Sequence, residues 1–399
     1  MKILLANKFY YRRGGDCIVT MNLEKLLNEH GHDTAIYSMN YPENLPSKWS
    51  SYWAPDMRPI DALTRPFGSR QVKEGFGRLL DDFRPEIVHL HNIHTQLSPV
   101  IAEIASQRGI PVVWTLHDTK PVCPCYTCMR NGEWCEECFT DAKAVVRHRC
   151  MPGSLPGAVI GWRELLKWNK EKLQSITNLF LPPSQFLKDV MVRGGYAAEK
   201  MEVLSNFIDT AKCEGVRYDN KGGDSYVYVG RVNRDKGVHT LCEAASQMPG
   251  HLTVIGDGEL LPELRERYAG SPNITFKGKM EWNDFRPLLE QARFMVVPSE
   301  WSENNPLTII ESLATGTPVL GARIGGIPEL ITEGVNGMTF TSGDVADLKE
   351  KIALMQQAEF DYPAIAREAA ERYSAESYYE RLMKIYRGLL TAQPHAGGC

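Results

Sequence analysis

The sequence predicts an α/β protein built from two doubly wound domains. Its 399 residues exceed the roughly 250–300 at which a single hydrophobic core stops growing, so two cores are expected. Hydrophobic residues make up 43% of the chain and charged residues 24%, which is the balance of an ordinary globular protein. Short apolar runs alternate with helix-like stretches in both halves, and this alternation is typical of parallel sheets covered by helices.

The first half of the chain holds six short apolar or β-branched runs that we expect to form one parallel sheet. Amphipathic helices are expected between them, for example at Cys17–His30 and Val100–Arg108. Gly31 and Gly109 should end these two helices, because glycine adopts the left-handed conformation of a helix cap without strain. The expected strands are Lys2–Ala6, Thr34–Ser38, Ile87–His91, Val112–Leu116, Leu179–Pro182 and Met201–Ser205.

The second half repeats the pattern after a polar stretch at Ile208–Ser225, which we expect to be a linker. Beyond Asp361 the chain is amphipathic at helical spacing, and Ala392–Cys399 should be a frayed tail. The expected strands of this half are Tyr226–Gly230, Leu252–Gly256, Ile274–Gly278, Phe294–Pro298 and Pro318–Leu320.

These patterns place a first domain at residues 1–207, with a cysteine-rich insertion at about 119–155, and a second domain at 208–373. Residues 374–399 are expected to form a helix that crosses back to the first domain, followed by the tail. Ligands bind beyond the carboxyl ends of parallel strands. We therefore expect the site in a cleft where the two domains face each other.

The charge balance excludes a general affinity for polyanions. With a net charge of -4, no nucleic acid partner is expected, so any phosphate must be held by locally placed basic groups and backbone amides. The opening run before Asn7 is too short for a signal-peptide core, and no run approaches the ~18 apolar residues of a membrane span, so a cytoplasmic location is expected. A basic, aromatic stretch fits either a membrane-surface contact or a solvated helix with a core-facing tryptophan: Trp162, Arg163, Lys167, Trp168, Lys170 and Lys172.

Two glutamates stand eight positions apart after the expected strand Phe294–Pro298. Glu303 lies in the loop at the carboxyl end of the strand, and Glu311 lies in the following helix. This placement allows one carboxylate to contact a sugar while the other reaches a ribose hydroxyl. On spacing alone, two solvated glutamates would be the commoner explanation.

The residues that follow favour a functional role for the two glutamates. Glu311-Ser-Leu-Ala-Thr-Gly-Thr-Pro-Val-Leu-Gly-Ala leads directly into Gly325-Gly-Ile-Pro-Glu, and this region resembles glycosyltransferase family 4, of the GT-B fold. The resemblance implies that Glu303 contacts donor sugar hydroxyls and that Glu311 holds the ribose. Where the family often has Gly-Phe-Gly-like residues, this chain has Asn304, Asn305, Pro306 and Leu307. We expect this departure to bear on which sugar is bound, with all four residues near the donor.

A second match follows the first strand of the second domain, at Gly230-Arg231-Val-Asn-Arg-Asp-Lys236-Gly. A basic pair in a loop is usually solvated. Its likeness to the family's Gly-Arg-x-x-x-x-Lys-Gly motif implies that Arg231 and Lys236 neutralise the departing diphosphate, for which a guanidinium fork and an ammonium are suited. Gly230 and Gly256 end neighbouring expected strands and are assigned to the donor site.

The first domain offers two further candidates. Gly14 and Gly15 precede a helix, where bare backbone amides can meet a phosphate, although such a pair is more often only a turn. His117 ends the strand Val112–Leu116; a lone histidine is usually structural, but the resemblance implies a hydrogen bond to the reacting sugar. For the alternating His89, His91 and His94, acceptor contacts or loop structure are expected ahead of a metal site.

The cysteine-rich insertion follows His117 directly. Some family 4 sequences have a Cys-Pro, a Cys-x-x-Cys and one later cysteine here, and that pattern selects Cys123, Cys135, Cys138 and Cys150 as ligands of a structural zinc. Cys125 and Cys128 are then extras, or they take part with Cys135 and Cys138 as two paired knuckles. Free or regulatory thiols are the next expectation, and disulfides the last in a reducing compartment.

Taken together, the resemblance implies a retaining glycosyltransferase that moves a hexosyl or related sugar from a nucleotide diphosphate sugar to a glycan or lipid-linked acceptor. Capsule, exopolysaccharide or lipopolysaccharide synthesis at the cytoplasmic face of the inner membrane is the expected setting. No catalytic cofactor is expected, because the basic pair takes the role of a divalent ion. The rival hypotheses are a GT-B epimerase or phosphorylase, and a catalytically silent binding scaffold.

Overall fold

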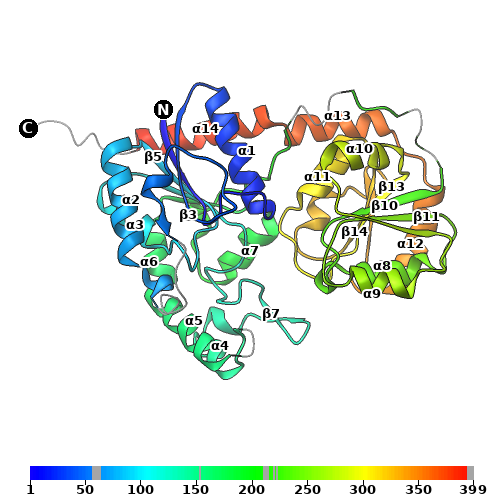
Figure 1. Ribbon diagram of the computed structural model, residues 1–399, viewed down its shortest axis with the longest axis horizontal. Helices are drawn as coiled ribbons and strands as arrows, with labels where there is room; N and C mark the ends of the chain where they lie inside the picture. Colours follow the sequence, from blue (N-terminus) through cyan, green and yellow to red (C-terminus); the bar gives the residue numbers. More distant parts are fainter. Residues whose placement is uncertain (56–63, 152–153, 210–214, 219–220, 222, 393–399) are drawn as a thin grey trace, which may run out of the picture. The chain divides into compact units, whose positions relative to one another are not determined.

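The computed structural model describes residues 1–55, 64–151, 154–209, 215–218, 221 and 223–392 (Figure 1). By its internal contacts the chain divides into two compact units: one holds Met1–Ser205 and the chain from Tyr379 onward, and the other holds Asn206–Tyr378. Parts of the expected linker at 208–225 and nearly all of the expected tail lie outside the described residues.

The first unit is built on a five-stranded parallel sheet in the order β2-β1-β5-β6-β9. Its inner strand β1 is apolar and buried from Ile3 to Ala6, as expected for a strand covered on both faces. The strands are β1 (Lys2–Ala6), β2 (Asp33–Tyr37), β5 (Ile87–Leu90), β6 (Val112–Thr115) and β9 (Leu179–Leu181). Five of the six strands expected in this half are thus confirmed.

The sixth expected strand, Met201–Ser205, is wrong. The segment runs beside β9, and the backbone N–H groups of Glu202 and Leu204 donate to the carbonyls of Phe180 and Pro182 at 3.1 and 3.0 Å. The ladder cannot continue because Pro182 has no N–H to donate in return. Only an isolated bridge between Phe180 and Met201 forms.

Helices connect these strands. Gly31 and Gly109 have φ of 76° and 70° and follow helices α1 and α3, as expected. Two small paired strands lie outside the main sheet, β3 (Met39–Asn40) with β4 (Ala54–Pro55) and β7 (Met129–Arg130) with β8 (Glu133–Trp134). The helices are α1 (Gly15–Glu29), α2 (Arg70–Phe83), α3 (Val100–Gln107), α4 (Ala144–Arg147), α5 (Leu155–Lys167), α6 (Lys170–Ser175) and α7 (Gln185–Arg193).

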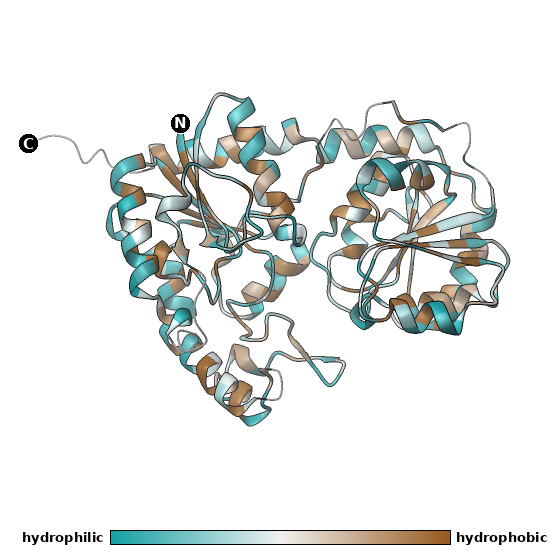
Figure 2. Ribbon diagram, viewed as in Figure 1, coloured by the Kyte–Doolittle hydropathy of each residue, from teal (hydrophilic) through white to brown (hydrophobic). Residues whose placement is uncertain are grey.

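The second unit has a six-stranded parallel sheet in the order β12-β11-β10-β13-β14-β15. The apolar residues of its strands and of the inner faces of its helices form the brown interior of Figure 2. Its strands are β10 (Ser225–Val229), β11 (His251–Ile255), β12 (Ile274–Gly278), β13 (Phe294–Val297), β14 (Val319–Ala322) and β15 (Gly337–Phe340).

Two buried clusters cover the two faces of this sheet. Helices α8 (Val238–Ala245), α9 (Leu261–Arg267) and α12 (Val345–Gln357) contribute to one cluster. Helices α10 (Trp282–Gln291), α11 (Leu307–Ala314) and α13 (Tyr362–Tyr373) contribute to the other. The unit is therefore a Rossmann-like layer structure of helix, sheet and helix.

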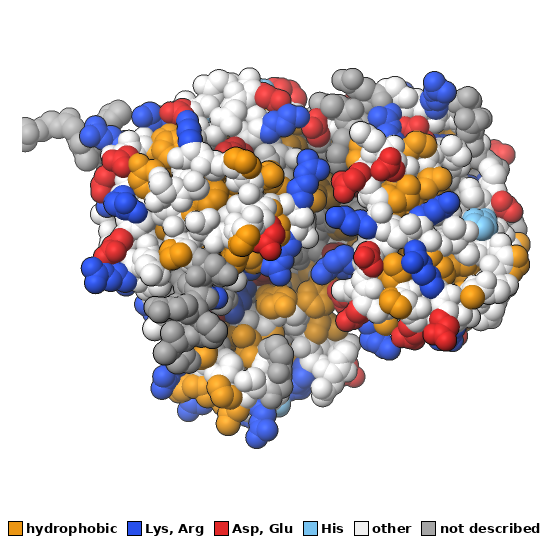
Figure 3. Space-filling model, in the orientation of Figure 1, with side chains coloured by type: hydrophobic (Ala, Val, Ile, Leu, Met, Phe, Trp, Pro, Cys, Tyr) orange, Lys and Arg blue, Asp and Glu red, His pale blue; other side chains and the backbone are white. Residues whose placement is uncertain are grey.

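Helix α14 (Ala375–Thr391) begins in the second unit and continues in the first. In the first unit Tyr379 stacks on His30 with ring centres 3.7 Å apart, and Arg381 donates to the carbonyl of Val203 at 2.6 Å. None of the helices in the described part of the chain has both the length and the apolar composition that a membrane crossing requires. Basic and acidic side chains are interspersed over the face shown in Figure 3.

Candidate active site

The sheet order of the second unit decides where a ligand can bind. Strand β10 has β11 on one side and β13 on the other, so the connections leave β10 and β13 in opposite directions. A crevice opens at the carboxyl ends of two such strands, and ligands of doubly wound sheets bind there. The loops at this point are the one with Arg231 and Lys236 after β10, and the one with Glu303 after β13.

These two loops meet at an ion pair. The Lys236 ammonium donates to Oε1 of Glu303, and the Ser299 hydroxyl donates to the same oxygen at 3.0 Å. The side chains of Lys236 and Glu303 are only 16% and 19% exposed. The short turn that carries Lys236 ends at Gly237, where φ is 65° and a Cβ atom would lie 1.9 Å from the carbonyl oxygen of Pro298. Glycine is required for this close packing of the two loops.

The Gly325-Gly326 pair holds the backbone of Glu303. The N–H of Gly326 donates to the Glu303 carbonyl at 2.7 Å. Gly325 has φ of 59°, and a Cβ atom there would lie 2.3 Å from that same carbonyl oxygen. The Gly325-Gly326 pair and the loop that carries Glu303 are therefore joined at the backbone of Glu303.

Asparagine side chains brace the next part of the loop. Oδ1 of the buried Asn305 accepts the N–H of Asn206 at 2.9 Å, and the Asn206 amide donates to the Asn305 carbonyl at 2.8 Å. Pro306 then precedes α11, whose first residue is Leu307, and Glu311 lies half-buried on this helix.

Two further glycines bring the β10 and β11 loops together. Gly256 has φ of 142°, and a Cβ atom there would lie 1.7 Å from the carbonyl oxygen of Gly230. The next residue, Arg231, has an exposed side chain, while its carbonyl accepts the Tyr228 hydroxyl at 2.6 Å. The glycines thus shape the loop from which Arg231 projects.

The first unit gathers three histidines at the carboxyl ends of β5 and β6. His89 and His91 stack with ring centres 4.6 Å apart, and His91 stacks on His117 at 5.4 Å. His91 Nδ1 and His117 Nε2 are 3.1 Å apart, within hydrogen-bond distance. Burial lowers the pKa of all three rings, that of His89 to about 3, so all are neutral at pH 7.

Charged groups missed by the sequence analysis lie near His117. Burial lowers the pKa of Lys8, and the carboxylates of Asp118 and Asp16 partly offset this effect. Burial also raises the pKa of Asp118. Lys8 lies two residues after the end of β1, so its position just beyond a strand was the available signal, and Asp16 is held by the Asn92 amide at 3.0 Å.

Gly14 is the N-cap of α1 in an extended conformation that any residue adopts. A Cβ atom on Gly15 would meet nothing within 4 Å, so packing does not require a glycine there. The assignment of this pair to donor phosphates stays a prediction.

Residues 13–212 match the family described as Glycosyltransferase Family 4, and residues 223–357 match Glycosyl transferases group 1. The chain belongs to glycosyltransferase family 4. Among curated relatives, the sulfoquinovosyl transferase of Arabidopsis thaliana is 24% identical over 73% of this chain and 54% of its own length. The glycogen synthase of Mycobacterium tuberculosis is 27% identical over 76% of this chain and 66% of its own length. The chain therefore spans about half to two thirds of these relatives.

Solved structures show the GT-B fold of this family 4 chain. The lipopolysaccharide outer core galactosyltransferase WaaB, in its apo form, superposes with a TM-score of 0.67 at 16% identity, covering 97% of this chain and 99% of that one. HepE of Anabaena, in complex with UDP, gives 0.67 at 17% identity, covering 97% and 100%. The predicted pair of Rossmann-like domains is confirmed.

The contacts among the cysteines of this family 4 chain differ from those that the predicted zinc site requires. Cys123 hydrogen-bonds with Cys125 and Cys128, the two that the family pattern left as extras; these contacts lower the pKa of Cys123 and raise the pKa of its two partners. In the described part of the chain no group of three or more His, Cys, Asp or Glu side chains could hold a metal ion, and the eight cysteines there are free thiols. The structure therefore does not support the structural zinc predicted at Cys123, Cys135, Cys138 and Cys150.

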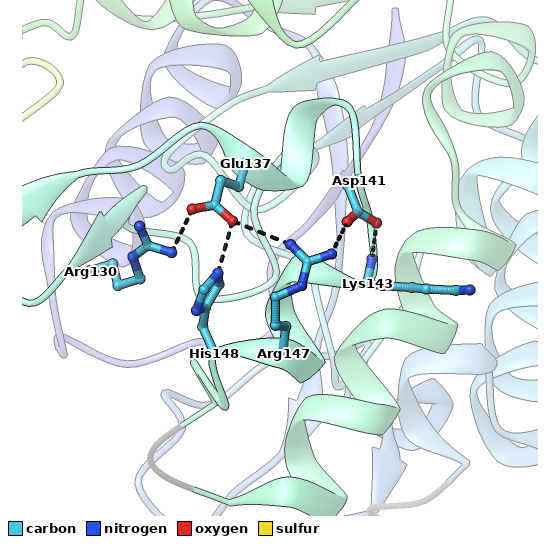
Figure 4. Close-up of polar contacts among 6 residues, drawn as sticks. All are labelled: Arg130, Glu137, Asp141, Lys143, Arg147 and His148. Carbon is cyan, nitrogen blue, oxygen red and sulfur yellow. Dashed lines mark hydrogen bonds and ion pairs between the residues drawn. The ribbon is translucent and has the colours of Figure 1, made fainter.

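Ion pairs hold the cysteine-rich insertion together (Figure 4). Glu137 accepts from Arg130 at 2.5 Å and contacts His148 at 2.8 Å, while Arg147 bridges Glu137 and Asp141 at 3.6 and 2.6 Å. The backbone N–H of Lys143 donates to Asp141 at 2.9 Å. These contacts tie the β7–β8 hairpin and α4 to the turn between them.

Proposed function

We propose that this protein is a retaining glycosyltransferase that moves a sugar from a nucleotide diphosphate sugar to a glycan or lipid-linked acceptor. The observation that carries the proposal is the ion pair of Lys236 and Glu303 at the switch point of the second sheet. HepE of Anabaena, which shares the fold, has been solved with UDP-glucose, and this supports a nucleotide sugar as donor.

The pair suggests how the donor is received. Without ligand, the Lys236 ammonium is neutralised by Glu303. A diphosphate that enters the crevice competes for the ammonium, and the carboxylate is then available to accept hydrogen bonds from sugar hydroxyls. Lys236, with Arg231 from the same loop, stabilises the charge that develops on the departing nucleoside diphosphate. This basic pair makes a catalytic divalent ion unnecessary, and the acceptor hydroxyl attacks from the face that the nucleotide leaves.

Two similarities support a polysaccharide or lipopolysaccharide acceptor. The lipopolysaccharide core biosynthesis glycosyltransferase LpsE of Rhizobium meliloti is 29% identical over 49% of this chain, and WaaB shares the fold. Such acceptors would bring the protein to the cytoplasmic face of the inner membrane. The basic stretch suggested for that contact is largely engaged elsewhere: Lys167 donates to Phe67 O at 2.5 Å, Lys172 pairs with Glu103 at 2.5 Å, and Trp168 is buried.

The experiment that tests the proposal is a release assay with a panel of UDP- and GDP-sugars and an acceptor extract from a polysaccharide-producing bacterium. We expect one donor to release its nucleoside diphosphate and to give a product whose anomeric configuration, measured by NMR, equals that of the donor. Lys236→Ala should lower kcat/KM about 30- to 900-fold, the effect of one preorganised charge. Lys279→Ala is the matched control, since Lys279 is 74% exposed in the same unit.

Four results would contradict the proposal. An inverted product would exclude retention, full activity of Lys236→Ala would exclude the leaving-group role, and epimerised donor without transfer would indicate the rival epimerase chemistry. Binding of a nucleotide sugar without turnover would indicate a silent scaffold.

A further inference from the structure

The proposed function does not use the hydrogen bonds that join and fix the three stacked histidines of the first unit. Residues two apart on a strand point to the same face of a sheet, which places His89 and His91 on one face at the end of β5. His117 follows the neighbouring strand β6 and lies against His91. Both nitrogens of His89 are engaged: Nδ1 with the Tyr386 hydroxyl at 2.6 Å and Nε2 with the Thr115 hydroxyl at 2.7 Å.

Each ring in this stack is neutral at pH 7 and therefore has one N–H donor and one acceptor nitrogen. The contact between His91 Nδ1 and His117 Nε2 contains a single hydrogen, which belongs to one nitrogen or the other. If His117 supplied it, His91 would have to place its own hydrogen on Nε2. If His91 supplied it, His117 would place its own hydrogen on Nδ1.

The surroundings of His91 distinguish these two arrangements. His91 is 1% exposed, and none of the described residues pairs with its Nε2. A hydrogen on Nε2 would thus be a buried donor without an acceptor, which proteins tolerate less than a buried acceptor without a donor. The arrangement in which His91 donates from Nδ1 avoids that orphaned donor.

We propose that His91 is a positioning residue that holds His117 in the tautomer with its hydrogen on Nδ1. The stack on His89, itself fixed by Tyr386 and Thr115, keeps the His91 ring in the orientation that makes this hydrogen bond. Nδ1 of His117 is then a donor, so any atom that hydrogen-bonds to it must be an acceptor. The role toward the sugar rests on the proposed function: in the transferase, His117 donates a hydrogen bond to a sugar oxygen and does not withdraw a proton from it.

The tautomer can be read directly by long-range ¹⁵N–¹H NMR of the full chain labelled at histidine, without substrate, with His117→Gln used to assign the signals. We expect the hydrogen of His117 on Nδ1 in the native protein. In His91→Phe, which keeps a flat ring but has no donor, His117 should populate the Nε2-protonated form. In His91→Asn, whose amide nitrogen can occupy the place of Nδ1, the native tautomer should return.

His94→Phe is the control, because His94 is buried in the same unit and its ring packs at a tilt against Trp114 instead of His117. It should leave the His117 tautomer unchanged. A native protein with the His117 hydrogen on Nε2 would overturn the proposal, as would a His91→Phe spectrum in which the native tautomer persists.

Activity provides a separate readout. With the donor identified by the release assay, His91→Phe should lower kcat about tenfold, the size of one neutral hydrogen bond, and His91→Asn should restore most of it. If the tautomers behave as expected but no nucleotide sugar is consumed by the native protein, the proposed function fails and the role of His91 stands.

Discussion

Gly256→Ala tests whether the close approach of the β10 and β11 loops shapes the donor crevice. The new Cβ atom would lie 1.7 Å from the carbonyl oxygen of Gly230, whereas real Cβ contacts are essentially never under 3.0 Å. One loop must therefore move by more than 1 Å, estimated as about 1.3 Å from those two distances. The φ of 142° adds strain, because only glycine readily adopts it. Strain of about 1–3 kcal/mol and overpacking of about 1–3 kcal/mol predict a loss of roughly 2–6 kcal/mol in stability.

The assay is urea unfolding followed by fluorescence, together with titration of UDP and GDP. Because Gly230 is followed by Arg231, displacement of the loop should weaken nucleotide binding as well as stability. Gly270→Ala is the control: Gly270 is exposed in the same unit, and a Cβ atom there would meet nothing within 4 Å. If Gly256→Ala unfolds at the same urea concentration as this control and binds nucleotide like the native protein, the packing argument is refuted.

Three other perturbations have expected outcomes. Arg231→Ala should lower kcat/KM by the equivalent of about 2–4 kcal/mol, and full activity would remove Arg231 from the leaving-group site. Glu311→Ala should weaken binding of the free nucleoside diphosphate while Glu303→Ala should mainly impair transfer; equal, native-like affinities in a calorimetric titration would exclude the ribose role. Burial in the folded state lowers the pKa of His89 to about 3, so the unfolded state is the one that binds the extra proton as the pH falls. The contribution of the neutral His89 ring to the free energy of unfolding is therefore complete above about pH 6.5. Below that pH the contribution falls by about 1.4 kcal/mol per pH unit. Urea midpoints that do not fall between pH 7.5 and 5.5 would contradict a neutral, buried ring.

The strands that the sequence predicted correctly are those whose apolar runs are continuous, such as Lys2–Ala6, because both faces of a parallel sheet are buried. Strand β15 was not predicted because it is short and begins with Gly337, a residue depleted in strands. Glycine is needed there, since a Cβ atom would lie 2.0 Å from the carbonyl oxygen of Val319 in β14. The strand expected at Met201–Ser205 does not form, because Pro182 beside it has no N–H to donate to the ladder.

In the candidate site, local motifs predicted some residues, whereas other contacts depend on the fold. Lys236 and Glu303 could be assigned from local motifs, and the structure brings the two together. The contact between His91 and His117 could not be foreseen, because it depends on β5 and β6 being neighbours in the sheet. Cysteine spacing alone did not reveal that Cys123 would contact Cys125 and Cys128.

The hydrogen bond between Tyr386 and His89 also bears on the order of events during synthesis. Domains usually fold as they leave the ribosome, beginning with the amino-terminal one. Here the interior of the first unit includes Leu382 and Tyr386, both fully buried, which are translated after the whole of the second unit. The unit that emerges first therefore waits for helix α14, and until then the nascent polypeptide exposes the apolar surface that this helix will cover.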